Sequence, residues 1–148
     1  ICSELRLGDL HLEIKSIGCP KCRAEYHKAL KEYFEVGEET KFARHRAVFK
    51  AIKEGVASLG LKEAIKDEIQ SGLVVSVKYP DDPNWSFEKV HDYCYERGYT
   101  IYPGKISTTN TFRRCSLGTI TPYDIKDFFV VLKEALRVNN IHIPAQYK

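Results

Sequence analysis

The chain has 148 residues, of which 43% are apolar and 29% are charged. This size and composition are typical of one globular domain, so we expect a single domain over residues 1–148. Its 23 basic and 20 acidic side chains leave a formal net charge of +3, which is too small an excess to favour nucleic acid or a membrane surface as a partner. No apolar run approaches the roughly 20 residues that a membrane-spanning helix needs.

Cysteine usage and the first residue bear on the setting of the protein. The five cysteines are odd in number and scattered, which favours a reduced, cytoplasmic location, or expression in a cytoplasm, over a disulfide framework. Residue 1 is Ile and methionine is absent, so we expect a fragment or a processed product.

The first half of the sequence predicts one strand and two helices. Residues 9–15 alternate apolar and polar side chains with the period of a half-buried strand. From Pro20 the apolar residues fall at helical spacing, and a second helical pattern ends at Gly60, a residue that suits the position after a helix. Gly37 lies between the two helical patterns and either kinks or interrupts them.

The second half begins with a strand, a helix and two further strands. Residues 73–79 are rich in β-branched side chains and predict a buried strand. An apolar stripe at helical spacing follows over residues 87–94 and predicts a helix. Two strands are then expected at residues 99–102 and 111–117, and the Pro-Gly pair at 103–104 predicts a loop between them.

A last helix completes the predicted fold. Thr121 is expected as its N-cap and Pro122 in its first turn, and the residues beyond Asn139 as a tail or an edge extension. The fold class is therefore α+β, with an antiparallel or mixed sheet of about four strands and helices packed mainly on one face. The order from residue 73 onward is that of a split βαβ arrangement. The strand at residues 9–15 would lie at an edge of the sheet, where it is a candidate surface for a homodimer.

Two segments of the second half carry a family resemblance. The sequence YERGYTIYPGK at residues 95–105, followed by TFR at 111–113, and FARHRAVFKAIKEGVASLGL at 42–61 resemble the C-terminal small domain of class V, fold-type I aminotransferases that depend on pyridoxal phosphate. Within that family the chain looks most like the 2-aminoethylphosphonate:pyruvate aminotransferase group. The resemblance covers residues 34–139, about two thirds of the chain.

The resemblance implies one site residue. Arg113 matches the arginine that binds a substrate anion, a role that suits the planar fork of a guanidinium. The sequence departs from the family directly after it, where Arg114, Cys115 and Ser116 replace an apolar residue, a small residue and Asn. The favoured interpretation is that Arg113 and Arg114 are both solvated strand charges. Successive arginines on a strand point to opposite faces, so the alternative is that one of the two lies at the interface of sheet and helices.

The same resemblance implies that the cofactor site is missing. In that family the Schiff-base lysine and most phosphate contacts belong to a large domain, to which nothing in this sequence corresponds. Lys105, in the loop motif, is not expected to replace that lysine because nothing near it predicts the desolvation that would lower its pKa. We therefore expect no bound cofactor and no independent catalysis.

The first segment resembles a different family. LGDLHLEIKSIGCPKCRAEYHKAL, at residues 7–30, resembles a strand and helix in the catalytic core of histidyl-tRNA synthetases. The two resemblances meet in one helical stretch, where sequences can be joined with little strain. Our leading hypothesis is an engineered or recombined structural hybrid with no catalytic function of its own. The alternatives are a fragment of a 2-aminoethylphosphonate-type aminotransferase that contributes Arg113, and a weak RNA-binding module built around ARHR at residues 43–46.

Cys19 and Cys22 form the one candidate metal pair. A CxxC supplies half of a tetrahedral zinc site, and no second closely spaced pair is present in the sequence. A role in packing is favoured, and zinc binding and redox chemistry remain alternatives. The histidines form no constellation that predicts catalysis.

Overall fold

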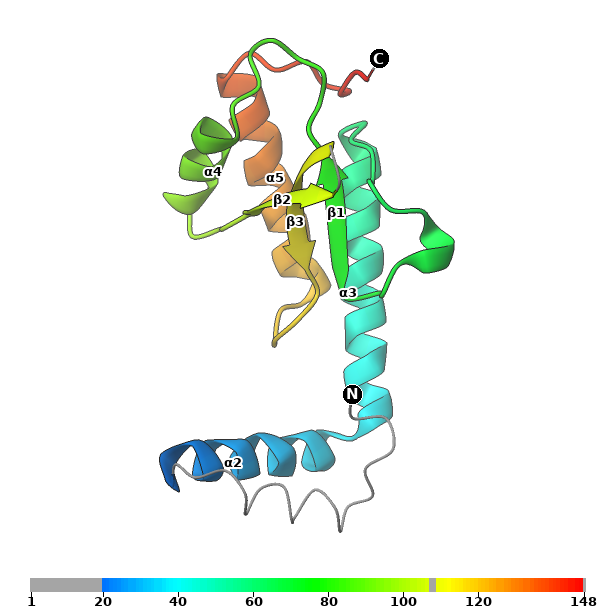
Figure 1. Ribbon diagram of the computed structural model, residues 1–148, viewed down its shortest axis with the longest axis vertical. Coiled ribbons are helices and arrows are strands. Elements are labelled where there is room, and N and C mark those ends of the chain that lie inside the picture. The colour runs from blue at the N-terminus through cyan, green and yellow to red at the C-terminus, as the bar shows by residue number, and fades with distance from the viewer. Residues whose placement is uncertain (1–19, 107–108, 148) are drawn as a thin grey trace. The chain divides into compact units, whose positions relative to one another are not determined.

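A computed structural model describes residues 20–106 and 109–147 of the chain (Figure 1). The strand expected at residues 9–15, and with it the candidate dimer edge, lies outside the described residues, as does Cys19. The chain divides into two compact units, Ile1–Phe42 and Ala43–Lys148, which we describe separately. Of the helices that the structure describes, none has the length and apolar character needed to cross a bilayer.

The described part of the first unit contains helix α2 (Pro20–Val36). It begins at the proline, as the sequence predicts, because proline at the first helical position loses no hydrogen bond. Two pairs at i, i+4 spacing, Lys28–Glu32 and Lys31–Glu35, lie along its surface at 3.9 and 3.8 Å. No residue of α2 is buried, and Phe34 in its apolar stripe is 52% exposed.

Gly37 interrupts the helical stretch. It adopts φ +82°, a left-handed backbone conformation that residues other than glycine rarely take. Its N–H donates to the carbonyl oxygen of Tyr33 at 3.1 Å. Helix α3 (Glu38–Ser58) begins immediately after it. The sequence left open whether Gly37 kinks or interrupts the helical stretch, and the structure shows an interruption.

The second unit is built on a three-stranded antiparallel sheet formed by β1 (Val74–Lys78), β2 (Tyr102–Ile106) and β3 (Thr109–Cys115). Strand β3 lies between the other two and runs antiparallel to both, so β1 and β2 are parallel to each other. Helix α4 (Phe87–Tyr95) connects them. The α+β class is confirmed; the described residues form three strands, and the fourth expected strand belongs to the undescribed residues 9–15.

The prediction of a loop at Pro103 and Gly104 is wrong. Both residues lie inside β2, where they pair with Phe112 and Thr111 of β3. Proline is tolerated there because β2 is an edge strand, in which one side of the backbone needs no partner in the sheet. Strand β2 begins at Tyr102, later than the start expected at residue 99. Strand β3 begins at Thr109, earlier than the start expected at residue 111.

The helices and the sheet share one core. Val75, Val77 and Phe112 of the sheet are at most 2% exposed and belong to the same buried cluster as residues from α3, α4 and helix α5 (Pro122–Val138). Figure 1 shows α5 behind the sheet and α3 alongside β1. The face of α5 toward the core carries the buried residues Ile125, Phe128, Phe129, Leu132, Ala135 and Leu136.

Local signals define the ends of the last two helices. Ser86 caps α4, with its side chain accepting from the N–H of Lys89. Thr121 caps α5 and forms a capping box with Asp124, followed by Pro122 in the first turn. The start of α5 is therefore confirmed residue by residue.

The segment after α5 folds back on the core instead of extending as a free tail. Ile141 is 4% exposed and part of the core cluster. The N–H of Ala145 donates to Leu59 at 2.9 Å, and the Tyr147 hydroxyl donates to the carbonyl oxygen of Lys78 at 3.1 Å. The C-terminal segment thus ties the end of α3 to the end of β1.

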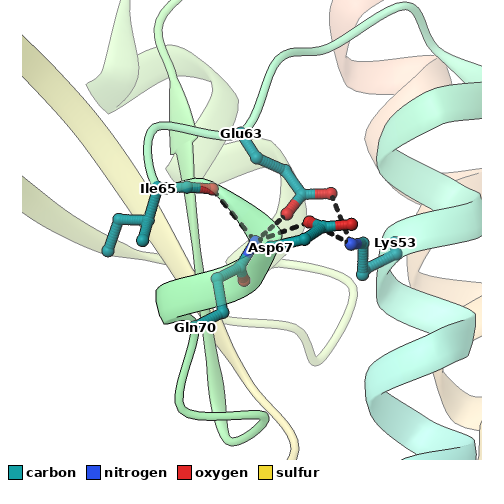
Figure 2. A network of polar contacts seen from close by, with 5 residues as sticks. All are labelled: Lys53, Glu63, Ile65, Asp67 and Gln70. Carbon is teal, nitrogen blue, oxygen red and sulfur yellow. Dashed lines mark hydrogen bonds and ion pairs between the residues drawn. The ribbon is translucent and has the colours of Figure 1, made fainter.

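A polar network fastens the loop between α3 and β1 (Figure 2). Lys53 of α3 forms ion pairs with Asp67 and, at 3.8 Å, with Glu63. The side-chain amide of Gln70 donates to Glu63 and, at 3.1 Å, to the carbonyl oxygen of Ile65. The hydrogen bond from Lys53 to Asp67 raises the pKa of the lysine above its ordinary value.

Candidate functional site

The two successive arginines of β3 point to opposite faces of the sheet. Arg114 pairs with Val75, whose side chain is in the core, whereas Arg113 pairs with Ser76 on the other face. Residues that pair directly across antiparallel strands share a face, so Arg114 is turned toward the helices and Arg113 away from them. The favoured interpretation of two solvated strand charges is therefore wrong for Arg114, which lies between sheet and helices, and holds for the exposed Arg113.

Arg114 is committed to packing. Its guanidinium carbon lies 4.5 Å from the centroid of the Phe128 ring, and one terminal nitrogen donates to the carbonyl oxygen of Thr100 at 3.3 Å. Its Nε is buried without a hydrogen-bond partner. Burial, which disfavours the charged form, lowers the pKa of Arg114. The guanidinium has no route to a ligand on the opposite face.

Arg113 is exposed and lies across its neighbour on β2. A Cβ atom added to Gly104 would be 2.6 Å from Nε and 3.2 Å from Cζ of Arg113. Only glycine therefore leaves room for the guanidinium at this point of the strand. Tyr102, which pairs with Arg113, is 60% exposed on the same face.

Arg113 is also free of a counter-ion. Over residues 20–106 and 109–147, no carboxylate lies within ion-pair distance of its guanidinium. An exposed guanidinium without a carboxylate retains its full capacity for an external anion. Among the predicted site residues that the structure describes, Arg113 is therefore an exposed cation without a carboxylate partner.

Thr111 is the residue of this face that the sequence reasoning missed. It lies two positions before Arg113 and pairs with Gly104 on one side and Lys78 on the other. Its side chain is 0% exposed, and its hydroxyl has no hydrogen-bond partner. The sequence contains one signal for this residue: side chains two positions apart in a strand share a face, so residues 111 and 113 lie on the same face.

The remaining candidates do not form a site. Cys22 is exposed on α2, and the described residues contain no group of three His, Cys, Asp or Glu side chains that could hold a metal. The side chain of Lys105 lies outside the described residues. His45 lies with Nδ1 2.8 Å from the carbonyl oxygen of Ser116, which fastens α3 to the end of β3.

A surface hollow of about 870 Å³ lies elsewhere on the second unit, and Arg113 is not among its lining residues. It is lined by the segment from Tyr79 to Pro83 together with Trp85, Thr109 and Asn110. Two of these residues, Asp82 and Trp85, stabilise the loop. Asp82 accepts from the N–H of Asn84 at 2.8 Å and of His142 at 2.9 Å. Trp85 stacks on Phe112.

The fold and the sequence place this chain beside one class of enzymes: it is partly homologous to the C-terminal part of class V aminotransferases. Among its relatives is the 2-aminoethylphosphonate--pyruvate transaminase of Phocaeicola vulgatus, 37% identical over 99 residues, which are 67% of this chain and 27% of that protein. The enzyme of the same name from Pseudomonas fluorescens is 31% identical over 115 residues, 77% of this chain and 31% of that protein. A match of that length within 148 residues necessarily includes Arg113.

Solved structures share the fold. The pyridoxamine-pyruvate aminotransferase of Mesorhizobium loti superposes with a TM-score of 0.68 at 25% identity, over 78% of this chain and 30% of that one. The ureidoglycine-glyoxylate aminotransferase of Bacillus subtilis superposes with a TM-score of 0.66 at 24% identity, over 74% of this chain and 28% of that one. No protein-family model matches the sequence. The chain spans about 30% of the length of the aminotransferases that it matches.

Proposed function

We propose that this chain supplies the substrate-anion arginine of an aminotransferase, and that Arg113 is this residue. The observation that carries the proposal is the exposed guanidinium of Arg113, turned away from the helices and without a carboxylate partner in the described part of the chain. Arg114, one residue later, is partly buried against Phe128 on the opposite face and does not take the same role. The partial homology to class V aminotransferases supports the reaction class.

The ligand chemistry follows from the guanidinium. Its parallel N–H groups match two oxygens of a carboxylate or a phosphonate, and its charge does not depend on pH in the physiological range. The relatives are named for 2-aminoethylphosphonate and pyruvate, which carry a phosphonate and a carboxylate. We expect Arg113 to bind such a group and to orient it, without taking part in proton transfer.

Lys53 does not suit an imine with pyridoxal phosphate. An amine that forms an imine with this cofactor must lose its proton, which requires a lowered pKa. Lys53 lies in the opposite situation, since its hydrogen bond to Asp67 raises its pKa. We propose that the cofactor and its lysine belong to polypeptide outside these 148 residues, and that the chain alone is not catalytic.

The proposal is tested by anion binding to the 148-residue protein. Methylphosphonate and acetate are titrated at constant ionic strength, and the Nε–Hε signal of Arg113 is followed by NMR. We expect saturable binding with Kd on the order of 1–10 mM, the affinity of one charged bidentate contact. Arg113→Gln should abolish it, and Arg97→Gln, which removes the same charge from an exposed arginine in the same unit, should not.

Two results would overturn the proposal. Anion binding that is absent in the wild-type protein, or unchanged in Arg113→Gln, would leave the inert structural hybrid as the better hypothesis. Addition of pyridoxal phosphate should produce no stable visible absorbance band. A stable band that disappears in Lys105→Ala would show that the chain holds the cofactor by itself. The hybrid origin and the RNA-binding alternative stay predictions of the sequence.

A further inference from the structure

Thr111 presents a buried polar atom that the sheet does not use. The residue is fully buried, and its Oγ1 neither donates nor accepts a hydrogen bond. A buried hydroxyl without a partner destabilises a folded protein by about 1–3 kcal/mol. Such an atom calls for an explanation, and a ligand that supplies the missing partner is one.

Gly104 brings this hydroxyl and Arg113 to the same place. A Cβ atom at Gly104 would lie 2.8 Å from Oγ1 of Thr111 and 2.6 Å from Nε of Arg113. Both atoms therefore border one small volume above the glycine, on the face of the sheet opposite the helices. The guanidinium and the hydroxyl occupy the space that a side chain at position 104 would need.

We propose that Thr111 and Arg113 form a two-donor oxyanion site over Gly104, in which the threonine hydroxyl is the second donor. This inference rests on the function proposed for Arg113. In this site the guanidinium moves away from Gly104 to meet the anion. The Thr111 hydroxyl, which is fully buried in the free protein and lies beside the same glycine, then donates to one oxygen of the ligand.

The number of donors favours one class of anion. The fork of a guanidinium occupies two oxygens, which satisfies a carboxylate. A phosphonate has a third oxygen, and the Thr111 hydroxyl is the donor available for it. We therefore assign Thr111 a role in specificity for anions with three oxygens.

The test compares methylphosphonate with acetate in the intact 148-residue protein. Thr111→Val removes the hydroxyl and keeps the shape of the side chain. It should weaken methylphosphonate binding about tenfold, the effect of losing one hydrogen bond to a charged group. Acetate binding should change by less than about twofold. Thr111→Ser, which restores the hydroxyl, should bind methylphosphonate as the wild type does.

Control variants separate this inference from the proposed function. Thr109→Val removes an exposed hydroxyl two residues earlier on the same face and should leave both affinities unchanged. Gly104→Ala fills the shared volume and should weaken both anions. Thr111→Ala serves as the smaller replacement if valine prevents folding, which circular dichroism reports.

The outcomes are distinguishable. If Arg113→Gln abolishes binding but Thr111→Val and Thr111→Ala bind methylphosphonate as the wild type does, the two-donor site is wrong and the role of Arg113 stands. If the wild type binds neither anion, or Arg113→Gln binds both, the proposed function fails and the two-donor site fails with it. An equal loss for acetate and methylphosphonate in Thr111→Val would contradict the assigned specificity.

Discussion

Arg114 places its guanidinium over the ring of Phe128, 4.5 Å from the centroid, in the layer between the sheet and α5. The charge is partly removed from water with one backbone carbonyl as its hydrogen-bond acceptor, while the buried Nε has none. Contact with an aromatic face offsets part of the desolvation cost. An apolar side chain of similar length would avoid that cost altogether.

Replacement of Arg114 by methionine is therefore expected to leave the protein at least as stable, with a gain of up to about 1 kcal/mol. Arg114→Ala should lose about 1–3 kcal/mol because the packing of the long stem on Phe128 disappears. Urea unfolding measures both. Arg113→Met, on the exposed face, is the matched control and should stay within about 0.5 kcal/mol. Equal losses in Arg114→Met and Arg114→Ala would mean that the charge itself is stabilising.

Gly55, in the interior of α3, is expected to resist replacement by alanine. Alanine in a helix normally gains about 0.5–1 kcal/mol over glycine. Here a Cβ atom would lie 2.1 Å from the ring of Phe129, so overpacking should dominate and cost about 1–3 kcal/mol. Unfolding of Gly55→Ala, and of the double variant with Phe129→Leu, checks the cause. If the smaller side chain at 129 does not recover part of the loss, the clash is not its source.

The protein should lose stability in acid through two carboxylates, Asp124 in the capping box of α5 and Asp82 in the loop before α4. Backbone N–H donors lower the pKa of Asp124, chiefly from Thr121, and of Asp82, chiefly from His142, below the ordinary value of 3.8. A lowered folded-state pKa stabilises the protein above the unfolded pKa and ceases to do so as the pH falls through the folded value. Unfolding free energies measured from about pH 6 to about pH 2 should fall below about pH 4.

Asp124→Asn and Asp82→Asn should each reduce the decrease in unfolding free energy that the wild type shows below about pH 4. Asp127→Asn, a carboxylate in the same helix as Asp124, is the control. Acid limbs that run parallel to the wild-type curve in both Asp124→Asn and Asp82→Asn would contradict the assignment.

The Lys53 network predicts the opposite pH dependence. The pKa of Lys53 is raised above 10.5, first by the hydrogen bond to Asp67. Its contribution is fully present below the unfolded pKa of about 10.4 and is lost as the pH rises through the folded value. Lys53→Met should therefore remove part of the loss of stability above about pH 10.

Lys50→Met provides the comparison on the same helix. Lys50 and Glu54 form an exposed pair at 3.8 Å, of a kind that contributes little to stability. The unfolding free energy of Lys50→Met should therefore decrease above about pH 10 as much as that of the wild type. An identical limb in Lys53→Met would show that the network does not couple protonation to folding.

The features that the sequence predicted correctly are those with local causes. Thr121 and Pro122 start α5 because capping involves atoms within one turn of the helix. The opposite orientation of Arg113 and Arg114 follows from the strand period alone. Which of the two enters the core depends on pairing with Val75, a residue far away in the sequence.

The failures have non-local causes. Pro103 and Gly104 have the composition of a turn, yet Pro103 lies on an edge strand and Gly104 makes room for Arg113. Neither fact is encoded within a few residues. The unpartnered hydroxyl of Thr111 is likewise a property of the assembled sheet, since every threonine carries the same group before folding.

The central position of β3 has a consequence for how the protein is made. During synthesis β1 and β2 emerge first, and neither has a partner in the sheet until β3 has left the ribosome and entered between them. Arg113 and Thr111 arrive on that same strand. On the proposal made for Arg113 and Thr111, a nascent chain that has not yet closed its sheet would lack the anion site, and anion binding would report closure of the sheet.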